Sequence, residues 1–225
     1  MTGSPSTDPR TRADHEAGHF IAAYAQGIVA RVEFLTIEQR GVIDGICALA
    51  TAVGTSRDAL MHYHMGGIVG EVLGKLYRKY CGRGASVNPQ ALEEEILAEV
   101  MKAIRSGGQS DAPKILADLD CYPPGQKPHA RDVAFSTVSL LSTHLDDLFL
   151  VSDALVERKT LFQDEAAFLV HTTKRNGAEV TRKAVDYYLL DRQPTDPPAL
   201  WLEGVEGEPG VFYEGPIAFF RRIGL

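Results

Sequence analysis

The sequence has few cysteines, no excess of basic residues and no long apolar run. Its three cysteines, Cys47, Cys81 and Cys121, show no C-x-x-C spacing, which argues against a disulfide framework and against a cysteine zinc site. The net charge of -7 argues against a surface for nucleic acid or anionic lipid. The apolar stretches are shorter than the roughly 18 residues of a membrane span, and the first residues do not resemble a signal peptide. We therefore expect a soluble, cytoplasmic protein with no nucleic-acid partner and no membrane anchor in this chain.

The periodicity of apolar residues indicates a mainly helical fold with a small strand element. Caps and breaks predict helices over about 9–26, 55–80, 89–106, 110–119, 130–150, 151–158, 165–176 and 180–190. Alternating side chains over 29–37, a polar turn and the segment 42–49 predict a strand pair. Residues 160–164 are expected to be a junction between helices. One domain should span 1–193, and the Pro- and Gly-rich segment 194–225 should be a C-terminal extension.

The clearest chemical pattern is HEAGH, at residues 15–19. His15 and His19 lie four residues apart, on one face of a helix, so both imidazoles can reach one metal ion. Glu16 can hold a carboxylate beside a water on that metal and accept its proton. The pattern H-E-x-x-H on a helix is typical of zinc metalloproteases.

The local context supports a helix around this short motif. Asp8 followed by Pro9 forms a suitable N-cap and first helical residue, and Gly27 can end the helix. The alternative is a buried amphipathic helix whose histidines have only core partners. The strand pair that follows is either a packing hairpin or an edge strand that binds a substrate backbone beside the metal, and the residues leave both open.

The second predicted helix is unusually rich in glycine. Gly66, Gly70 and Gly74 recur at a spacing of four, which predicts the close approach of another helix, most simply the one with the histidines. On such a helix Glu71 is a natural third zinc ligand. His62 and His64 lie only two residues apart and are expected to be structural or exposed.

Four blocks of the sequence resemble the peptidase domain of FtsH-type membrane-anchored, ATP-dependent zinc proteases. In the order of that family they are HEAGH, VARVEFLTIEQRG, GGIVGEVLGKLY and ALVERKTLFQDEAAFLV. The resemblance covers about residues 11–172. It implies a helical metallopeptidase domain with a small β element, similar to the FtsH protease domain.

The resemblance also implies a ligand set and an activity. The stretch GGQSDAPKILADL carries the family's third metal ligand onto Asp111, so Zn²⁺ is expected on His15, His19 and Asp111, with Glu71 orienting a ligand histidine. Glu16 is then the catalytic base of an endopeptidase.

The chain departs from the family in two respects. An extra acidic helix precedes Asp111, and no P-loop is present. We therefore expect ATP-independent hydrolysis of peptides or unfolded protein segments, with a separate unfoldase or adaptor as an additional partner. The alternative is a non-catalytic interaction protein that binds a partner through its strand edge or its C-terminal tail.

Overall fold

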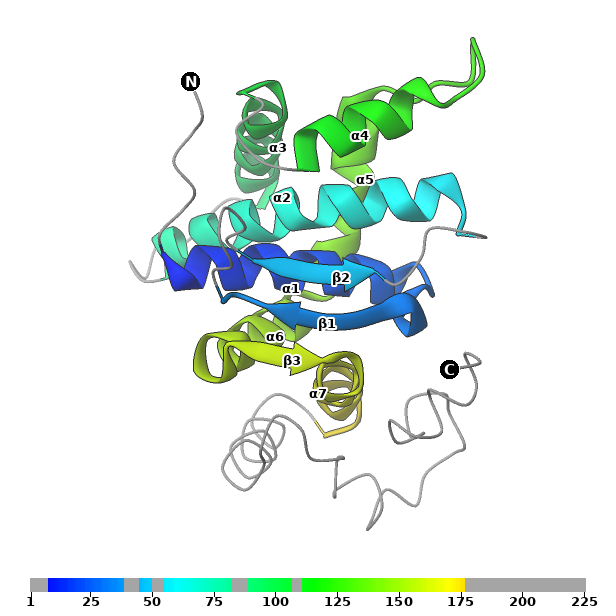
Figure 1. Ribbon diagram of the computed structural model, residues 1–225. Coiled ribbons are helices and arrows are strands. Elements are labelled where there is room, and N and C mark those ends of the chain that lie inside the picture. The colour runs from blue at the N-terminus through cyan, green and yellow to red at the C-terminus, as the bar shows by residue number, and fades with distance from the viewer. Residues whose placement is uncertain (1–7, 39–44, 50–54, 82–88, 107–110, 177–225) are drawn as a thin grey trace.

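The computed structural model describes residues 8–38, 45–49, 55–81, 89–106 and 111–176 (Figure 1). Its elements follow in the order α1 (Pro9–Ala25), the short 3-10 helix η1 (Val29–Arg31), β1 (Val32–Thr36), β2 (Ile46–Leu49), α2 (Arg57–Cys81), α3 (Pro89–Ser106), α4 (Asp111–Asp120), α5 (Ala130–Ser142), α6 (Leu145–Arg158), β3 (Thr160–Phe162) and α7 (Gln163–Asn176). The prediction of a mainly helical fold with a small strand element is confirmed. The predicted helix over 180–190 and the extension 194–225 lie outside the described residues.

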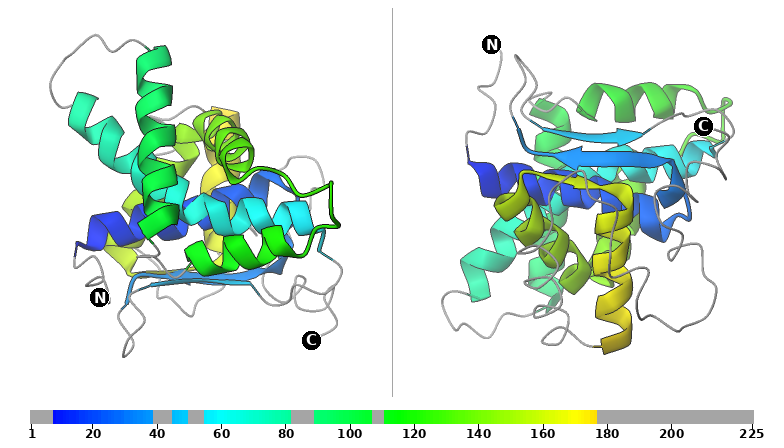
Figure 2. Two further views of the ribbon diagram at one scale, coloured as in Figure 1. Left: turned by 90° about the horizontal axis from the view of Figure 1, so that it is seen from above. Right: turned by 60° about the horizontal axis from the view of Figure 1, so that its bottom comes forward.

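The three strands form one antiparallel sheet in the order β2-β1-β3. In its register Leu35 of β1 lies opposite Cys47 of β2 and Leu161 of β3. The sheet forms a thin layer along one side of the helices, with α1 next to it (Figure 2). The predicted strand pair is confirmed, but the expectation of a mere junction at 160–164 was wrong. A strand of three residues is too short to show the alternation that identifies strands in a sequence.

Helices α1 and α2 cross with their backbones in contact. A Cβ atom added at Gly18 would lie 2.2 Å from the carbonyl oxygen of Gly66, and one added at Gly70 would lie 2.5 Å from the carbonyl oxygen of Asp14. Ordinary side chains cannot fit at such separations, so these positions require glycine. The predicted close approach of the glycine-rich helix to the histidine helix is confirmed.

The caps of these two helices follow the sequence closely. The Asp8 side chain accepts hydrogen bonds from two amides in the first turn of α1, and Gly27 after the helix has a φ of 71°. At the start of α2 the Ser56 hydroxyl accepts a hydrogen bond from the amide of Ala59. Ser56 lies three residues before that amide, which is the usual capping geometry.

A buried carboxylate joins three helices next to the motif. Asp14 of α1 is fully buried and accepts hydrogen bonds from Arg78 of α2 and from Ser152 of α6, the latter at 2.6 Å. Burial raises the pKa of Asp14, while the Arg78 guanidinium and the Ser152 hydroxyl act in the opposite direction. Removing either donor leaves a buried carboxylate short of partners, so this network holds α1 in place beside α2 and α6.

Two expectations from composition can be compared with the structure. Cys47 is buried and Cys121 is exposed, and both have free thiols. Among the described residues, no helix combines the length and the apolar character needed to cross a membrane.

The close α1–α2 crossing predicts that one added methyl group will lower the stability of the protein strongly. Gly18→Ala places its Cβ against the backbone of Gly66 and should destabilise the protein by about 3 kcal/mol, measured by denaturant unfolding. As a control, Gly27→Asn puts a side chain into open space at a positive φ that asparagine tolerates, and should cost less than about 1 kcal/mol. Equal stability of Gly18→Ala and the wild type would contradict the close crossing.

Candidate metal centre

Three side chains predicted as metal ligands converge in the structure. Nε2 of His15 lies 2.8 Å from Oδ2 of Asp111, Nε2 of His19 lies 3.0 Å from the same oxygen, and the two Nε2 atoms are 3.2 Å apart. His19 is 5% exposed and Asp111 is 1% exposed. The ligand atoms of a tetrahedral zinc ion, at about 2.0–2.1 Å from the metal, are roughly 3.3 Å apart. A small opening of this cluster is therefore enough to admit the metal.

Two helices deliver these groups. Helix α1 carries both histidines on one face, and α4 begins at Asp111, where the exposed amides of a first turn favour a carboxylate. The second carboxylate oxygen of Asp111, Oδ1, lies 2.9 Å from Nζ of Lys114. Asp111 thus directs one oxygen to the two imidazoles and the other to the ammonium group of Lys114.

Helix α2 orients both imidazoles through their other ring nitrogens. Nδ1 of His19 lies 2.7 Å from the carbonyl oxygen of Tyr63, so it carries the proton and donates it there. Nδ1 of His15 faces Oε2 of Glu71 at 3.6 Å. Each Nε2 is then directed at the cluster, the arrangement common among metal-binding histidines, and a metal would take the place of the proton there. Asp111 faces the Nε2 atoms, while Glu71 lies on the opposite nitrogen of His15.

The charges in the cluster are strongly coupled. Burial alone lowers the pKa of His15, but the carboxylates of Asp111 and Glu71 outweigh it and raise that pKa to about 10. Burial of Asp111 acts to raise its pKa, and the two histidines overcome this effect and hold it well below the usual range. The cluster therefore favours a positive charge between the carboxylate and the imidazoles. A divalent cation on two imidazoles and one carboxylate meets the same requirement and matches a common catalytic zinc site.

Glu16, the predicted base, lies between α1 and strand β2. It is 6% exposed, and a Cβ atom added at Gly45, just before β2, would lie 2.6 Å from its Oε1. Burial raises the pKa of Glu16, and the charge of the neighbouring histidines and the backbone amide of Cys47 act against this rise. A carboxylate in such a place can accept and return a proton.

Gly67 provides the space on which the cluster depends, and sequence reasoning missed this role. A Cβ atom at this position would lie 2.4 Å from Nε2 of His19 and 2.8 Å from Nε2 of His15. The sequence offered one signal for this role: Gly67 follows Gly66 directly but does not belong to the series Gly66, Gly70 and Gly74, so helix packing does not explain it. Tyr63 was also missed, because a tyrosine on the apolar face of a helix resembles any other core residue.

The remaining polar candidates of α2 have partners elsewhere. Nδ1 of His62 lies 2.7 Å from Oγ1 of Thr137, and Nδ1 of His64 lies 2.7 Å from Oδ2 of Asp118. The expectation of a structural or exposed role for both histidines agrees with these contacts.

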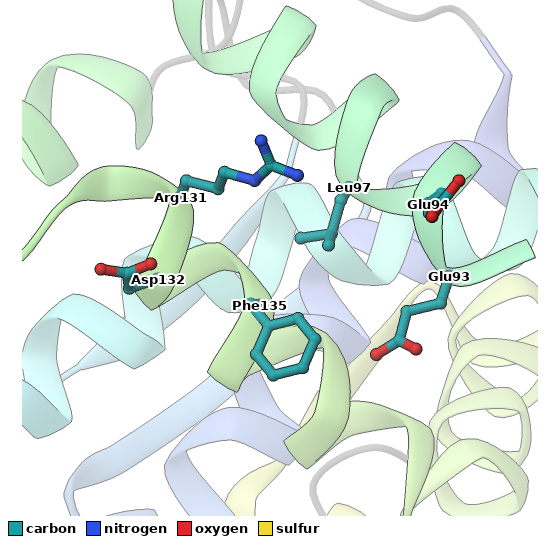
Figure 3. A pocket seen from close by; sticks show the side chains of 6 residues that line it. All are labelled: Glu93, Glu94, Leu97, Arg131, Asp132 and Phe135. Carbon is teal, nitrogen blue, oxygen red and sulfur yellow. The ribbon is translucent and has the colours of Figure 1, made fainter. Parts of the chain in front are cut away.

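A separate cleft lies between α3 and α5 (Figure 3). Its volume is about 360 Å³, and it is lined by Glu93, Glu94, Leu97, Arg131, Asp132 and Phe135. None of these residues belongs to the histidine cluster, and the acidic side chains at this cleft are not accompanied by a histidine. The cleft adds nothing to the metal chemistry.

Comparisons with protein-family models, with curated proteins and with solved structures give no match for this chain. The function of this chain is therefore inferred from the geometry of the cluster and from the four sequence blocks that resemble the FtsH-type peptidase domain. Only the geometry identifies the individual atoms that would bind a metal.

The two acidic neighbours of the histidines should differ in their effect on zinc. Asp111→Ala removes the oxygen shared by both Nε2 atoms and should abolish stoichiometric zinc in protein purified without chelator. Glu71→Ala removes a contact to Nδ1 of His15, which is not a proposed ligand atom, and should weaken affinity by roughly tenfold. Asp118→Ala, on the same helix as Asp111, is the control and should retain zinc. Loss of zinc in the Glu71 variant alone would reverse the assignment.

A second test uses the space at Gly67. Gly67→Ala puts a methyl group against both Nε2 atoms and should lower zinc affinity by about tenfold or more, measured by chelator competition. Gly74→Ala is a matched control on the same helix, because its Cβ would lie 2.2 Å from Oδ2 of Asp14 rather than in the cluster. It should lose stability but keep its zinc affinity. Equal affinity of both variants for zinc would show that Gly67 does not border the metal.

Proposed function

We propose that this chain is a zinc-dependent peptidase that holds its metal with His15, His19 and Asp111 and uses Glu16 as its general base. The observation that carries the proposal is the convergence of two Nε2 atoms and one carboxylate oxygen, which lie 2.8–3.2 Å from one another. Both imidazoles have partners at Nδ1, so that Nε2 is the nitrogen turned toward Asp111 and toward a metal. Glu16 comes from the same turn of helix as His15, which puts a proton acceptor beside the ligands.

The residues of the chain have distinct roles in the proposed reaction. Zinc, when bound, supplies a Lewis acid that polarises a peptide carbonyl and acidifies a water molecule. Glu16 takes a proton from the attacking water and passes it to the nitrogen of the leaving amine. Lys114 balances the charge of Asp111 from the side opposite the histidines. Tyr63 and Glu71 keep the two imidazoles in the orientation that binding requires.

We infer a fold similar to the FtsH protease domain. The four blocks of sequence likeness fall on α1, on η1 and β1, on α2, and on α6 with β3 and α7. Helix α1, which carries both histidines, contacts α2, α6 and β1. The likeness in sequence thus covers α1 and elements that pack against it, which supports the inference.

The proposed substrates are peptides and unfolded segments of proteins. Within the described part of the chain β2 is an edge strand of the sheet, and Glu16 lies beside it. A site next to a strand edge suits an extended backbone whose own amides and carbonyls are unpaired. A stably folded substrate opens such a segment only rarely, so a separate unfoldase or adaptor is the expected partner for folded substrates. The sequence contains no P-loop, and the proposed hydrolysis does not depend on ATP.

Replacing the proposed base should separate chemistry from assembly. Glu16→Gln keeps the size of the side chain but cannot accept the proton, so cleavage of an unfolded protein should fall by about a hundredfold or more. Zinc content and melting temperature should remain close to those of the wild type, because Glu16 is not among the ligands. Zinc analysis, thermal unfolding and a gel-based cleavage assay measure the three quantities.

The control variant is Glu99→Gln, which changes a carboxylate that pairs with Lys102 on the surface of α3. It should cleave the unfolded substrate as the wild type does, with or without ATP. Turnover of the Glu16 variant at the wild-type rate would contradict the mechanism. A strict need for ATP in the purified chain would contradict the proposed independence from a motor.

A further inference from the structure

Tyr63 of α2 makes two contacts with His19 of the candidate metal centre and one with strand β2. It is 5% exposed, and its ring packs on the His19 imidazole with the two centroids 4.8 Å apart. Its carbonyl oxygen accepts the Nδ1 proton of His19 at 2.7 Å. Its hydroxyl donates a hydrogen bond to the carbonyl oxygen of Cys47 at 2.5 Å. One residue thus contacts both a proposed metal ligand and strand β2.

Strand β2 borders the proposed base at the same place. The backbone at Gly45 lies against the Glu16 carboxylate, and the backbone amide of Cys47 donates a hydrogen bond to that carboxylate. Cys47 therefore has its carbonyl oxygen held by Tyr63 while its amide faces Glu16. The strand, the base and the ligand histidine are linked through a single side chain.

We propose that Tyr63 is a positioning residue whose hydroxyl fixes strand β2, and with it Glu16, relative to the metal ligand His19; the part that concerns catalysis rests on the proposed function. The strand is only four residues long and lies at the edge of the sheet in the described part of the chain. Its place beside α1 therefore depends on contacts with the helices as well as on its pairing with β1. A displacement of about 1 Å at a catalytic group is enough to lower a rate by roughly a hundredfold.

Tyr63→Phe isolates the hydroxyl. Phenylalanine keeps the ring against His19, and the backbone carbonyl that accepts the Nδ1 proton is unchanged. Only the donor to Cys47 is removed, so the carbonyl of β2 loses its buried partner. Zinc affinity should stay within about threefold of the wild type, because the ligand atoms and their orientation remain.

The coupling can be measured without any activity. In a background with Cys81→Ser and Cys121→Ser, Cys47 is the only thiol, and its burial makes alkylation report on local opening of β2. Zinc should slow this alkylation by about fivefold or more in the parent and by less than about twofold in Tyr63→Phe, because the link between metal and strand is lost. Tyr77→Phe is the matched control on the same helix, with its ring against Phe149, and should retain the zinc effect. An equal zinc effect in the Tyr63 variant and its parent overturns the proposal.

Kinetics then test the consequence for catalysis. On a peptide substrate, Tyr63→Phe should lower kcat by about tenfold or more with KM and zinc content little changed, because the base is misplaced while the metal remains. An unchanged kcat in the zinc-loaded variant overturns the positioning role. If the wild type cleaves no peptide, the proposed function fails, and the alkylation result still decides whether Tyr63 couples the strand to the metal centre.

Discussion

The backbone contact between α1 and α2 is the constraint on which the candidate centre depends. Gly18 on one helix and Gly66 and Gly70 on the other allow the two axes to approach until carbonyl groups and Cα atoms touch. At that separation α2 reaches both imidazoles of α1, offering a carbonyl at Tyr63 and open space at Gly67. A larger side chain anywhere along this contact would separate the histidines from the groups that orient them. The glycines weaken α2 as an isolated helix, and their role is to bring the two helices together.

Three buried carboxylates of this region have different partners. These partners indicate a structural role for Asp14 and a chemical role for Asp111 and Glu16. Asp14 binds an arginine and a serine from neighbouring helices, which stabilises the fold. Asp111 faces two imidazoles through one oxygen and Lys114 through the other, and its carboxylate favours a cation at the imidazoles. Glu16 lies against the backbone of β2 and has a raised pKa because of its burial. Burying a charged carboxylate without a partner costs free energy. A cation bound at the neighbouring histidines would lower that cost for Glu16.

Much of the fold near the motif could be predicted from local rules, while most contacts around the cluster could not. The α1 helix follows from Asp8 and Gly27, and the helix crossing follows from the spacing of Gly66, Gly70 and Gly74. Asp111 lies ninety-two residues beyond His19, so no local spacing can connect them; only the resemblance to a family did so. Tyr63, Gly67 and β3 act through tertiary contacts that leave no periodic signal. Local chemistry therefore predicts the elements, and packing decides which side chains meet.

The proposal from which the others follow is that His15, His19 and Asp111 bind one metal ion. Anomalous diffraction from crystals of the zinc-loaded chain, recorded on both sides of the zinc absorption edge, tests it directly. If these residues bind the metal, one strong zinc peak per chain will lie about 2.0–2.2 Å from Nε2 of both histidines and from Oδ2 of Asp111. A zinc peak away from this cluster, a zinc ion bound by Glu71 in place of Asp111, or no peak in the presence of excess zinc would contradict it.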